Sequence, residues 1–272
     1  MTGPSGRRKW HAPPATPPFP PPFLPDVTLV AVTSVALLQT VRAIELSLEQ
    51  ARFGAVFLIG DQPPPPRTSD RIGWRRVAPI ASHAAYSRFM LHELRHHVAT
   101  SHVLCVQWDG YVLDGRGWDG GFLDYDYIGA PWPQFDDGHV VGNGGFSLRS
   151  KRLLDACHAL GIDAAPEDVA ICRTHRSALE DGFGIRFAPE DVARRFAFER
   201  HPCSGAEFGF HGVFNLARLV GPRQMDDIIA HLDPAVLNRR EHRELLRFAL
   251  RRGRLGLART ILRRLRQGAG RR

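Results

Sequence analysis

The chain has 272 residues, of which 43% are hydrophobic and 24% are charged, and its net charge is +8. This composition supports a packed core and predicts a soluble globular protein with one large domain or two small ones. Its four cysteines include no C-x-x-C pair, which argues against a disulfide framework and favours a reducing, cytoplasmic location.

The first 25 residues are basic and then rich in proline. They lack the continuous apolar core of a signal peptide, so we expect a disordered leader in polyproline II form. The apolar run over 27–38 is too short to cross a bilayer and belongs in a core. We therefore expect no transmembrane helix.

After the leader, hydrophobic periodicity predicts strands that alternate with helices. Because the strands are apolar along their whole length, they are typical of a parallel sheet covered on both faces. The first half of the chain is therefore predicted to have an α/β fold. The expected strands are 27–34, 55–61, 74–80 and 102–110, and the expected helices between them are 36–54 and 82–100.

Polar residues stand where these strands end. In parallel sheets, ligands bind beyond the carboxyl ends of the strands, which makes Thr33, Asp61 and Asp109 candidate site residues. Asp109 follows the apolar run Val103–Val106 and precedes a glycine. It is either a carboxylate at a binding site or an ordinary Asp-Gly turn residue.

The glycine-rich stretch over 140–150 reads VVGNGGFSLRS. Asn143-Gly144 is typical of a type I′ hairpin turn, because both residues tolerate positive φ. Alternatively, Gly144 and Gly145 leave bare backbone against which a ligand can lie. The stretch alone leaves both interpretations open.

Two later segments share one helix-start pattern. Pro166-Glu167-Asp168 places a proline before two acids, as ordinary helices do, and Pro189-Glu190-Asp191 repeats it. The repetition shows that the pattern need not mean catalysis. Before these segments we expect a helix over 150–160, and after them a glycine-aromatic strand flanked by His201 and His211.

The positive charge is concentrated at the carboxyl end. Residues 239–272 contain thirteen arginines and two glutamates, so the remainder of the chain is net acidic. Over 242–267, leucines recur at helical spacing among the arginines, which predicts a basic amphipathic helix. This helix either contacts a membrane surface or acidic partner, or packs its aliphatic side chains on the domain with its arginines in water.

Taken together, these motifs resemble the GT-A fold glycosyltransferases. They are most similar to an uncharacterised bacterial and fungal domain-of-unknown-function family of predicted glycosyltransferases. The resemblance covers approximately Asp26 to Leu216, and its motifs are specific only as a set. They are Gln107–Gly110, Tyr127–Trp132, Gly142–Arg149 and Phe208–Gly212.

The resemblance implies a divalent cation, manganese or magnesium, on the donor diphosphate. It maps the last acid of the fold's D-x-D motif onto Asp109 and the carboxyl-terminal metal histidine onto His211. Gln107 departs from the pattern, because the D-x-D motif of the wider fold has an acid there, and this puts metal dependence in question. His211 could equally be a histidine that is hydrogen-bonded within its strand.

The resemblance also implies roles around the glycine-rich stretch. Gly144 and Gly145 would make room for the transferred sugar, while Asn143 or Arg149 bonds its hydroxyls or phosphate. Glu167-Asp168 matches the segment that carries the base in inverting members. An acid opposite the leaving diphosphate suits removal of the acceptor proton, and we favour Asp168 over Glu167.

The resulting hypothesis is a nucleotide-sugar-dependent, inverting glycosyltransferase that acts on a glycan or glycolipid acceptor in polysaccharide or glycoconjugate synthesis. We expect a GT-A-like domain over 26–220 and a helical basic region over 221–272, which could hold the protein at the inner membrane surface. A non-catalytic nucleotide-sugar or glycan-binding protein is the first alternative. A nucleic-acid-binding protein is the second, and no nucleic acid is expected because the charge is confined to one terminal segment.

Overall fold

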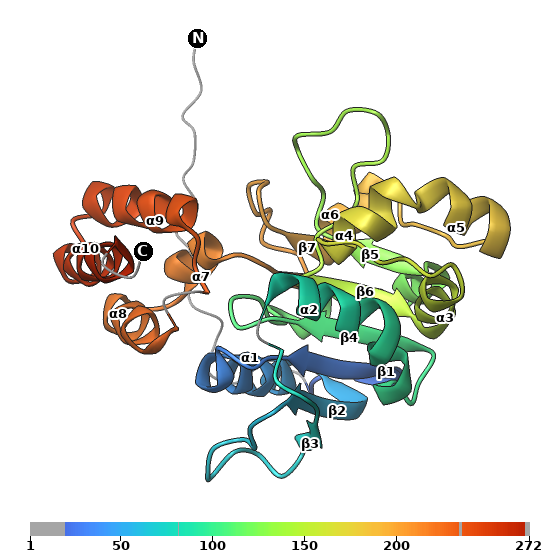
Figure 1. Cartoon of the computed structure of the whole chain (residues 1–272), viewed down its shortest axis with the longest axis horizontal. Coiled ribbons are helices and arrows are strands. Elements are labelled where there is room, and N and C mark those ends of the chain that lie inside the picture. Colours follow the sequence, from blue (N-terminus) through green and yellow to red (C-terminus); the bar gives the residue numbers. More distant parts are fainter. Residues whose placement is uncertain (1–19, 81, 234–235, 270–272) are drawn as a thin grey trace. The chain divides into compact units, whose positions relative to one another are not determined.

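The computed structural model describes residues 20–80, 82–233 and 236–269 (Figure 1). The chain divides into two compact units, a larger one over Phe19–Gly212 and a smaller one that contains Val213–Arg272. The division falls at Gly212 rather than at the expected boundary at residue 220. Most of the predicted leader lies outside the described residues.

The larger unit is built on a six-stranded sheet in the order β3-β2-β1-β4-β6-β5. The pairs β1/β2, β1/β4 and β2/β3 are parallel, whereas β6 runs antiparallel to both β4 and β5. The prediction of an α/β fold with a mostly parallel sheet is therefore confirmed. The strands are β1 (Phe23–Val32), β2 (Arg52–Gly60), β3 (Gly73–Arg76), β4 (His102–Val106), β5 (Tyr127–Gly129) and β6 (Phe146–Ser150).

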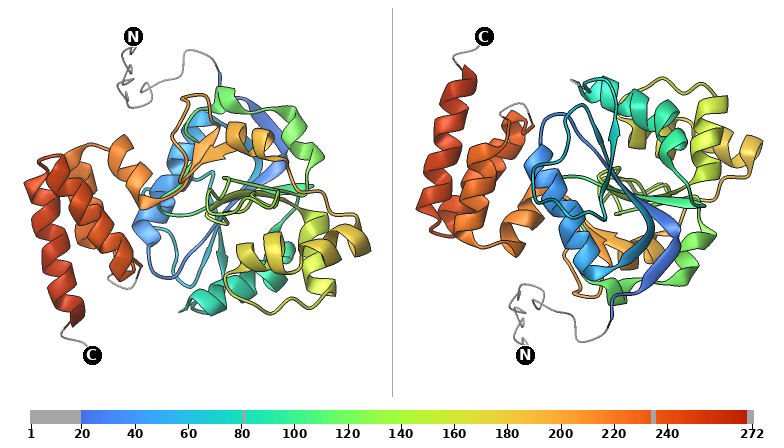
Figure 2. Two further views of the ribbon diagram at one scale, coloured as in Figure 1. Left: turned by 90° about the horizontal axis from the view of Figure 1, so that it is seen from above. Right: turned by 90° about the horizontal axis from the view of Figure 1, so that it is seen from below.

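Helices cover both faces of this sheet (Figure 2). Alternate residues of β1 face opposite ways, as strand geometry requires. Leu29 and Ala31 pack in a cluster with the buried side chains of α1 (Leu37–Gln50). Val30 and Val32 pack instead with the segment of α2 (His83–Arg88), which continues through a π-helical turn and a 3₁₀ turn to His97.

Two boundaries differ from the sequence prediction. Helix α1 ends at Gln50 rather than near Gly54, because Arg52 already pairs with β1. Gly54 lies inside β2, where a Cβ atom would come within 2.1 Å of the Pro25 carbonyl oxygen. Strand β1 begins at Phe23, so its first residues belong to the predicted leader.

The reversed direction of β6 brings the glycine-rich stretch to the carboxyl edge of the sheet. Phe146 begins β6 and pairs with Val106, the last residue of β4. The residues before β6 and the residues after β4 therefore meet at one edge. A second, two-stranded parallel sheet is formed by β7 (Ala197–Phe198) and β8 (Gly209–Phe210).

The remaining elements of the larger unit are short helices. The expected helix after the glycine-rich stretch is α3, which Ser150 caps by accepting a hydrogen bond from the Leu153 amide. The helices are α3 (Lys151–Ala159), α4 (Glu167–Val169), α5 (Arg176–Phe183) and α6 (Glu190–Phe196), with single turns at Gly115–Gly117, Gly120–Asp124 and Ala170–Thr174.

The smaller unit is helical. It comprises α7 (Val213–Leu219), α8 (Pro222–His231), α9 (Arg239–Arg251) and α10 (Leu255–Ala269). The single amphipathic helix predicted over 242–267 is two helices, because Gly253 adopts φ +65° between them.

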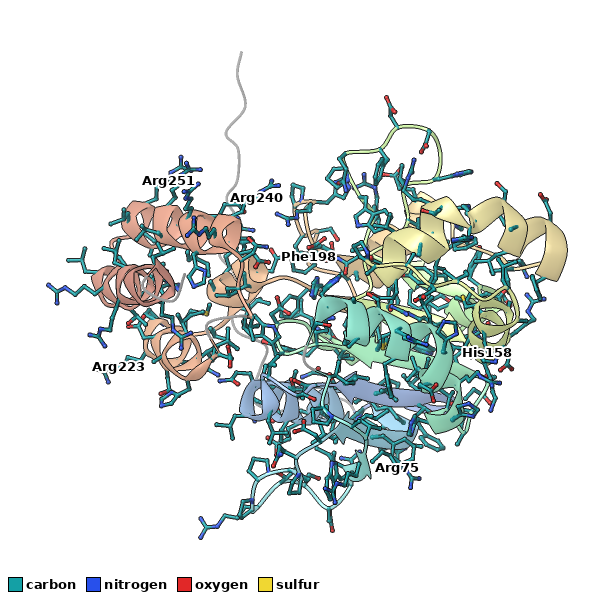
Figure 3. All side chains as sticks on the ribbon, in the orientation of Figure 1. Arg75, His158, Phe198, Arg223, Arg240 and Arg251 are labelled. Atoms are coloured by element: carbon teal, nitrogen blue, oxygen red, sulfur yellow. The ribbon has the colours of Figure 1, made fainter. Side chains whose placement is uncertain are left out.

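Several apolar side chains of this unit are buried, and many of its arginines are exposed. Leu245, Ala249, Leu257 and Ile261 are buried, whereas arginines such as Arg240 and Arg251 project outward from α9 (Figure 3). In the part of the chain that the structure describes, no helix has the length and apolar character needed to cross a membrane.

Candidate functional site

Three polar side chains converge beyond the carboxyl end of β4. The Nε2 atom of His211 lies 3.2 Å from Oε1 of Gln107 and 3.3 Å from Oδ1 of Asp109. Asp109 is buried, and its Oδ1 atom has no hydrogen-bond partner of good geometry. We refer to Gln107, Asp109 and His211 as the strand-end cluster.

The backbone holds the two halves of this cluster together. The amide of Gly212 donates a hydrogen bond to the Asp109 carbonyl oxygen over 3.1 Å. Gly110 must lack a side chain, because a Cβ atom there would lie 2.6 Å from the Phe210 carbonyl oxygen. The Asp-Gly pair therefore allows β8 to approach the end of β4 closely, and Asp109 is more than a surface turn residue.

Glu199 approaches the other nitrogen of the His211 ring. Phe198 of β7 pairs in register with Phe210 of β8, so the next residues of the two strands, Glu199 and His211, lie side by side. The His211 Nδ1 atom is 3.6 Å from Glu199 Oε1. Burial opposes a charged imidazole, but Asp109 and Glu199 outweigh it and raise the pKa of His211 to about 10.

The strand-end cluster presents donor atoms suited to a divalent cation. A hydrogen on Nε2 lets the ring donate to Gln107 Oε1 and also faces Asp109 Oδ1. If Nε2 carries no hydrogen, its lone pair faces the two oxygen atoms, and a metal ion between the three atoms would relieve the repulsion. Adjacent ligands of an octahedral cation with bonds of about 2.1 Å are about 3 Å apart, and the two separations from His211 Nε2 are close to this value.

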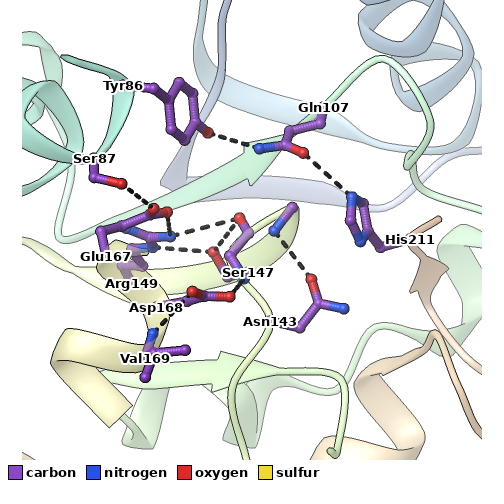
Figure 4. A network of polar contacts seen from close by, with 12 residues as sticks. Tyr86, Ser87, Gln107, Asn143, Ser147, Arg149, Glu167, Asp168, Val169 and His211 are labelled. Atoms are coloured by element: carbon purple, nitrogen blue, oxygen red, sulfur yellow. Dashed lines mark hydrogen bonds and ion pairs between the residues drawn. The ribbon is translucent and has the colours of Figure 1, made fainter. Parts of the chain in front are cut away.

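As a candidate metal site, the cluster would have an amide among its three donors. Among the described residues, no group of three or more His, Cys, Asp or Glu side chains is arranged to hold a metal ion. Gln107 would thus complete a set with one carboxylate and one imidazole. Its amide nitrogen donates to the Tyr86 hydroxyl over 3.0 Å, which turns the amide oxygen towards His211 (Figure 4).

The glycine-rich stretch makes room for the protein's own side chains. A Cβ atom on Gly145 would lie 2.1 Å from the His211 Nε2 atom, and one on Gly144 would lie 2.6 Å from Glu167 Oε1. This differs from the expectation that both glycines leave space for a sugar ring. The space on the Cβ side of Gly145 is filled by the imidazole of the strand-end cluster.

The hairpin interpretation of Asn143-Gly144 is wrong. Asn143 has φ +65°, but Gly144 has no positive φ, so the pair does not form a type I′ turn. The stretch is a buried bend, in which Asn143 Oδ1 accepts a hydrogen bond from the Gly145 amide over 3.0 Å. The positive φ of Asn143 and the hydrogen bond that its side chain accepts thus both shape the backbone beside His211.

Arg149 was expected to contact the hydroxyls or phosphate of the sugar donor, but it lies elsewhere. Its side chain is fully buried, and its Nη2 atom lies 3.1 Å from Glu167 Oε1. Its Nε donates to Ser147 Oγ over 3.0 Å (Figure 4). Its guanidinium also lies over the Tyr127 ring. Arg149 therefore organises the interior behind the glycine-rich bend.

Glu167, the less favoured base, is the partner of this buried arginine. Its second oxygen accepts a hydrogen bond from Ser87 Oγ over 3.2 Å. Both carboxylate oxygens are thus engaged by protein groups, and the side chain is almost inaccessible. Its burial and its ion pair with Arg149 make Glu167 a weaker candidate for proton transfer than Asp168, which is only half-buried.

Asp168 faces the glycine-rich bend. Its Oδ2 atom accepts a hydrogen bond from the Gly144 amide over 3.0 Å, and its Oδ1 accepts one from the Val169 amide over 2.8 Å. Burial and the neighbouring Glu167 raise the pKa of Asp168 despite these two donors. Gly144 and Gly145 thus join a carboxylate of raised pKa to the strand-end cluster.

Two predicted residues make local contacts instead. The Thr33 hydroxyl accepts hydrogen bonds from the Val35 and Ala36 amides and so shapes the turn before α1. Asp61 follows β2 and accepts a hydrogen bond from the Gln62 side chain. Both stand at the carboxyl edge of the sheet, as predicted. These contacts account for Thr33 without a ligand, whereas the Oδ1 atom of Asp61 is buried and makes no hydrogen bond to any described residue.

Sequence reasoning missed Tyr86, Ser87 and Glu199. Tyr86 and Ser87 lie on α2 and reach Gln107 and Glu167. Helical periodicity alone cannot distinguish these two residues from other polar or partly polar residues on a helix. Glu199 follows a strand of two residues, which is too short to give a periodic signal.

The fold and the site together define an α/β protein with a polar cluster at the carboxyl edge of a mostly parallel sheet. A family model described as a protein of unknown function, DUF5672, matches residues 75–211, which is half of the chain. The chain therefore belongs to this family. The matched region includes the strand-end cluster, the glycine-rich bend and Asp168.

The solved structures that are similar to this chain include those of GlyE and LgtC. No curated protein matches the sequence. The apo form of the glycosyltransferase GlyE from Streptococcus pneumoniae TIGR4 is 13% identical, with a TM-score of 0.41, over 68% of this chain and 54% of that one. An active-site mutant of LgtC is 14% identical, with a TM-score of 0.42, over 68% of this chain and 86% of that one. The chain spans about half the length of the GlyE structure.

Proposed function

We propose that the protein is a nucleotide-sugar-dependent glycosyltransferase that inverts the anomeric centre. The observation that carries this proposal is the position of Gly144 and Gly145. The Gly144 amide donates a hydrogen bond to Asp168, and Gly145 lies against His211 of the strand-end cluster. A proton acceptor and a set of cation ligands are thereby joined by two adjacent residues.

In this proposal, Asp168 removes the proton from the acceptor hydroxyl as the sugar is transferred. A general base works best when its pKa approaches the operating pH, and the raised pKa of Asp168 moves it in that direction. The amides of Gly144 and Val169 fix the orientation of the carboxylate. A single base that acts opposite the leaving group is the arrangement expected for inversion.

Gln107, Asp109 and His211 would hold a manganese or magnesium ion. When bound, such an ion neutralises charge on the donor diphosphate and so makes it a better leaving group. Asn143 is assigned to the donor, because its side chain is buried beside Gly145. We expect the acceptor to be a glycan or glycolipid. We also propose that the protein lies in the cytoplasm, where the basic helices α9 and α10 could contact a membrane surface.

The test is a panel of nucleotide sugars, each offered with and without manganese. A true donor raises the melting temperature by mass action and releases nucleoside diphosphate on turnover when a glycan or glycolipid acceptor is present. The Asp168→Asn variant should still be stabilised by the donor but should release no diphosphate. Stabilisation of the wild-type protein without release for any donor and acceptor would favour the non-catalytic binding protein.

A further inference from the structure

The strand-end cluster has a deficit of negative charge for a cation site. Its only carboxylate is Asp109, because Gln107 contributes a neutral amide and a metal-bound His211 is neutral. Divalent hard cations bind most tightly to sites with more anionic oxygen. A second carboxylate close to the cluster would correct this deficit.

Glu199 is that carboxylate, on the far side of the imidazole. Its position is set by the pairing of β7 with β8, which places the residues after the two strands next to each other. The amide of His211 also donates to the Phe198 carbonyl oxygen over 3.1 Å, which fixes the backbone on both sides of the pair. Only 16% of the Glu199 side chain is exposed, so water screens its interaction with the ring poorly, and its Oε1 atom is shared with Arg200 Nε, also 3.6 Å away.

The distances indicate how Glu199 acts on His211. A carboxylate at Nδ1, 3.6 Å away, favours a hydrogen on that nitrogen, whereas Gln107 Oε1 and Asp109 Oδ1 favour one on Nε2, whose place a bound cation would take. The Nε2 lone pair is then directed at the position shared with Gln107 Oε1 and Asp109 Oδ1. Gly145 allows this ring orientation, because any Cβ atom there would collide with Nε2.

We propose that Glu199 is a positioning residue for the cation, which orients His211 and supplies, through the imidazole, the second negative charge that Gln107 does not provide. The inference rests on the proposed function, because it assigns the cation to the same site. Glu199 does not touch the cation or the substrates in this proposal. It acts by keeping the imidazole hydrogen of His211 on Nδ1 and by making Nε2 a stronger ligand for the cation.

The experiment is manganese binding to the full chain, measured by titration calorimetry and by the electron paramagnetic resonance signal of free manganese. Loss of an outer carboxylate typically weakens metal binding 10- to 100-fold, and we expect a loss of about that size for Glu199→Gln. The matched control is Glu207→Gln. Glu207 is another buried carboxylate of the same segment, but it accepts hydrogen bonds from the amides of Ser204, Gly205 and Ala206.

A second variant separates charge from folding. Gln107→Asp in the Glu199→Gln background returns one carboxylate to the cluster and should restore part of the lost affinity.

In the wild-type protein loaded with the diamagnetic ion magnesium, the nitrogen-15 spectrum of His211 should show the hydrogen on Nδ1. This last measurement needs no variant that could misfold.

The outcomes distinguish this inference from the proposed function. Equal manganese affinity in wild type and Glu199→Gln, or equal losses in Glu199→Gln and Glu207→Gln, would overturn the role of Glu199. A wild-type protein that binds no manganese would overturn it as well. Manganese binding that depends on Glu199, without transfer from any nucleotide sugar, would support the inference and contradict the proposed function.

Discussion

The segments Ala165–Ala170 and Ala188–Ala193 have the same sequence, APEDVA, and opposite environments. In both, the proline is the N-cap and the helix begins at the glutamate. In α4, however, Glu167 is buried against Arg149, whereas in α6 Glu190 is 45% exposed and pairs with Arg194 of its own helix. The identical local sequence determines the helix start, and distant strands determine the chemistry.

The aspartates differ in the same way. Asp168 accepts a hydrogen bond from Gly144, which lies far away in the sequence. Asp191 has 75% of its side chain exposed and lies 3.7 Å from Arg195 of its own helix. Because helix propensity and the helix dipole act equally on both members of each pair, matched substitutions isolate the contribution of the tertiary environment.

The largest expected difference is catalytic. Asp168→Asn should lower the rate of sugar transfer by about 10²- to 10⁴-fold, the usual contribution of a general base, while donor binding persists. Asp191→Asn should leave the rate unchanged, because that side chain faces water. Steady-state release of nucleoside diphosphate measures both. If Asp191 proved indispensable and Asp168 dispensable, the base would be misassigned.

The next difference is in the free energy of unfolding. Glu167→Ala leaves the buried Arg149 charge without its partner and should cost about 3–5 kcal/mol. Glu190→Ala removes an exposed pair and should cost less than about 1 kcal/mol. Urea denaturation of both variants gives the comparison.

A double substitution checks the cause of the larger loss. Arg149→Met combined with Glu167→Leu removes the buried charges together and should recover part of the stability, because burial of the charges is itself costly. Similar losses for Glu167→Ala and Glu190→Ala would instead mean that Arg149 is solvated in solution.

The smallest expected effect concerns pH. A folded-state pKa above the unfolded value stabilises the protein fully below the unfolded pKa, and this contribution is lost as the pH rises through the folded pKa. The pKa of Asp168 is raised by burial and by Glu167, so ionisation of this carboxyl group opposes folding. Asp168→Asn should therefore melt at or above the wild-type temperature at pH 7 and lose that advantage in acid.

The control for this effect is again Asp191→Asn. That side chain is exposed and near Arg195, so we expect no pH-dependent gain in melting temperature. Thermal melts of both variants between pH 4 and 8 provide the measurement. A destabilised Asp168→Asn at pH 7 would show that hydrogen bonds to the ionised carboxylate outweigh its burial.

Much of the fold could be predicted from the sequence, because the strands are apolar runs that alternate with periodic helices. The carboxyl-edge rule also directed attention to Asp109, which lies in the strand-end cluster. The helix boundary near Gly54 was wrong because the glycine serves close packing in β2 rather than helix termination. Local sequence does not distinguish these two uses of glycine.

The details of the site could not be predicted for a related reason. All five residues of β6 are buried, so alternation gave no sign that Arg149 faces an interior carboxylate. Glu199 meets His211 only because two strands of two residues pair in one register. Gly145 is required by His211, a partner distant in the sequence. Contacts of this kind depend on tertiary structure and leave no local pattern.

The central claim is that Gln107, Asp109 and His211 form the cation site of a transfer centre. The most direct test is a crystal structure of the protein with manganese and a nucleoside diphosphate, with anomalous diffraction used to locate the metal. We predict one anomalous peak bonded to Gln107 Oε1, Asp109 Oδ1 and His211 Nε2, with the diphosphate on its open side. A peak elsewhere, or no peak while the diphosphate is bound, would contradict the claim.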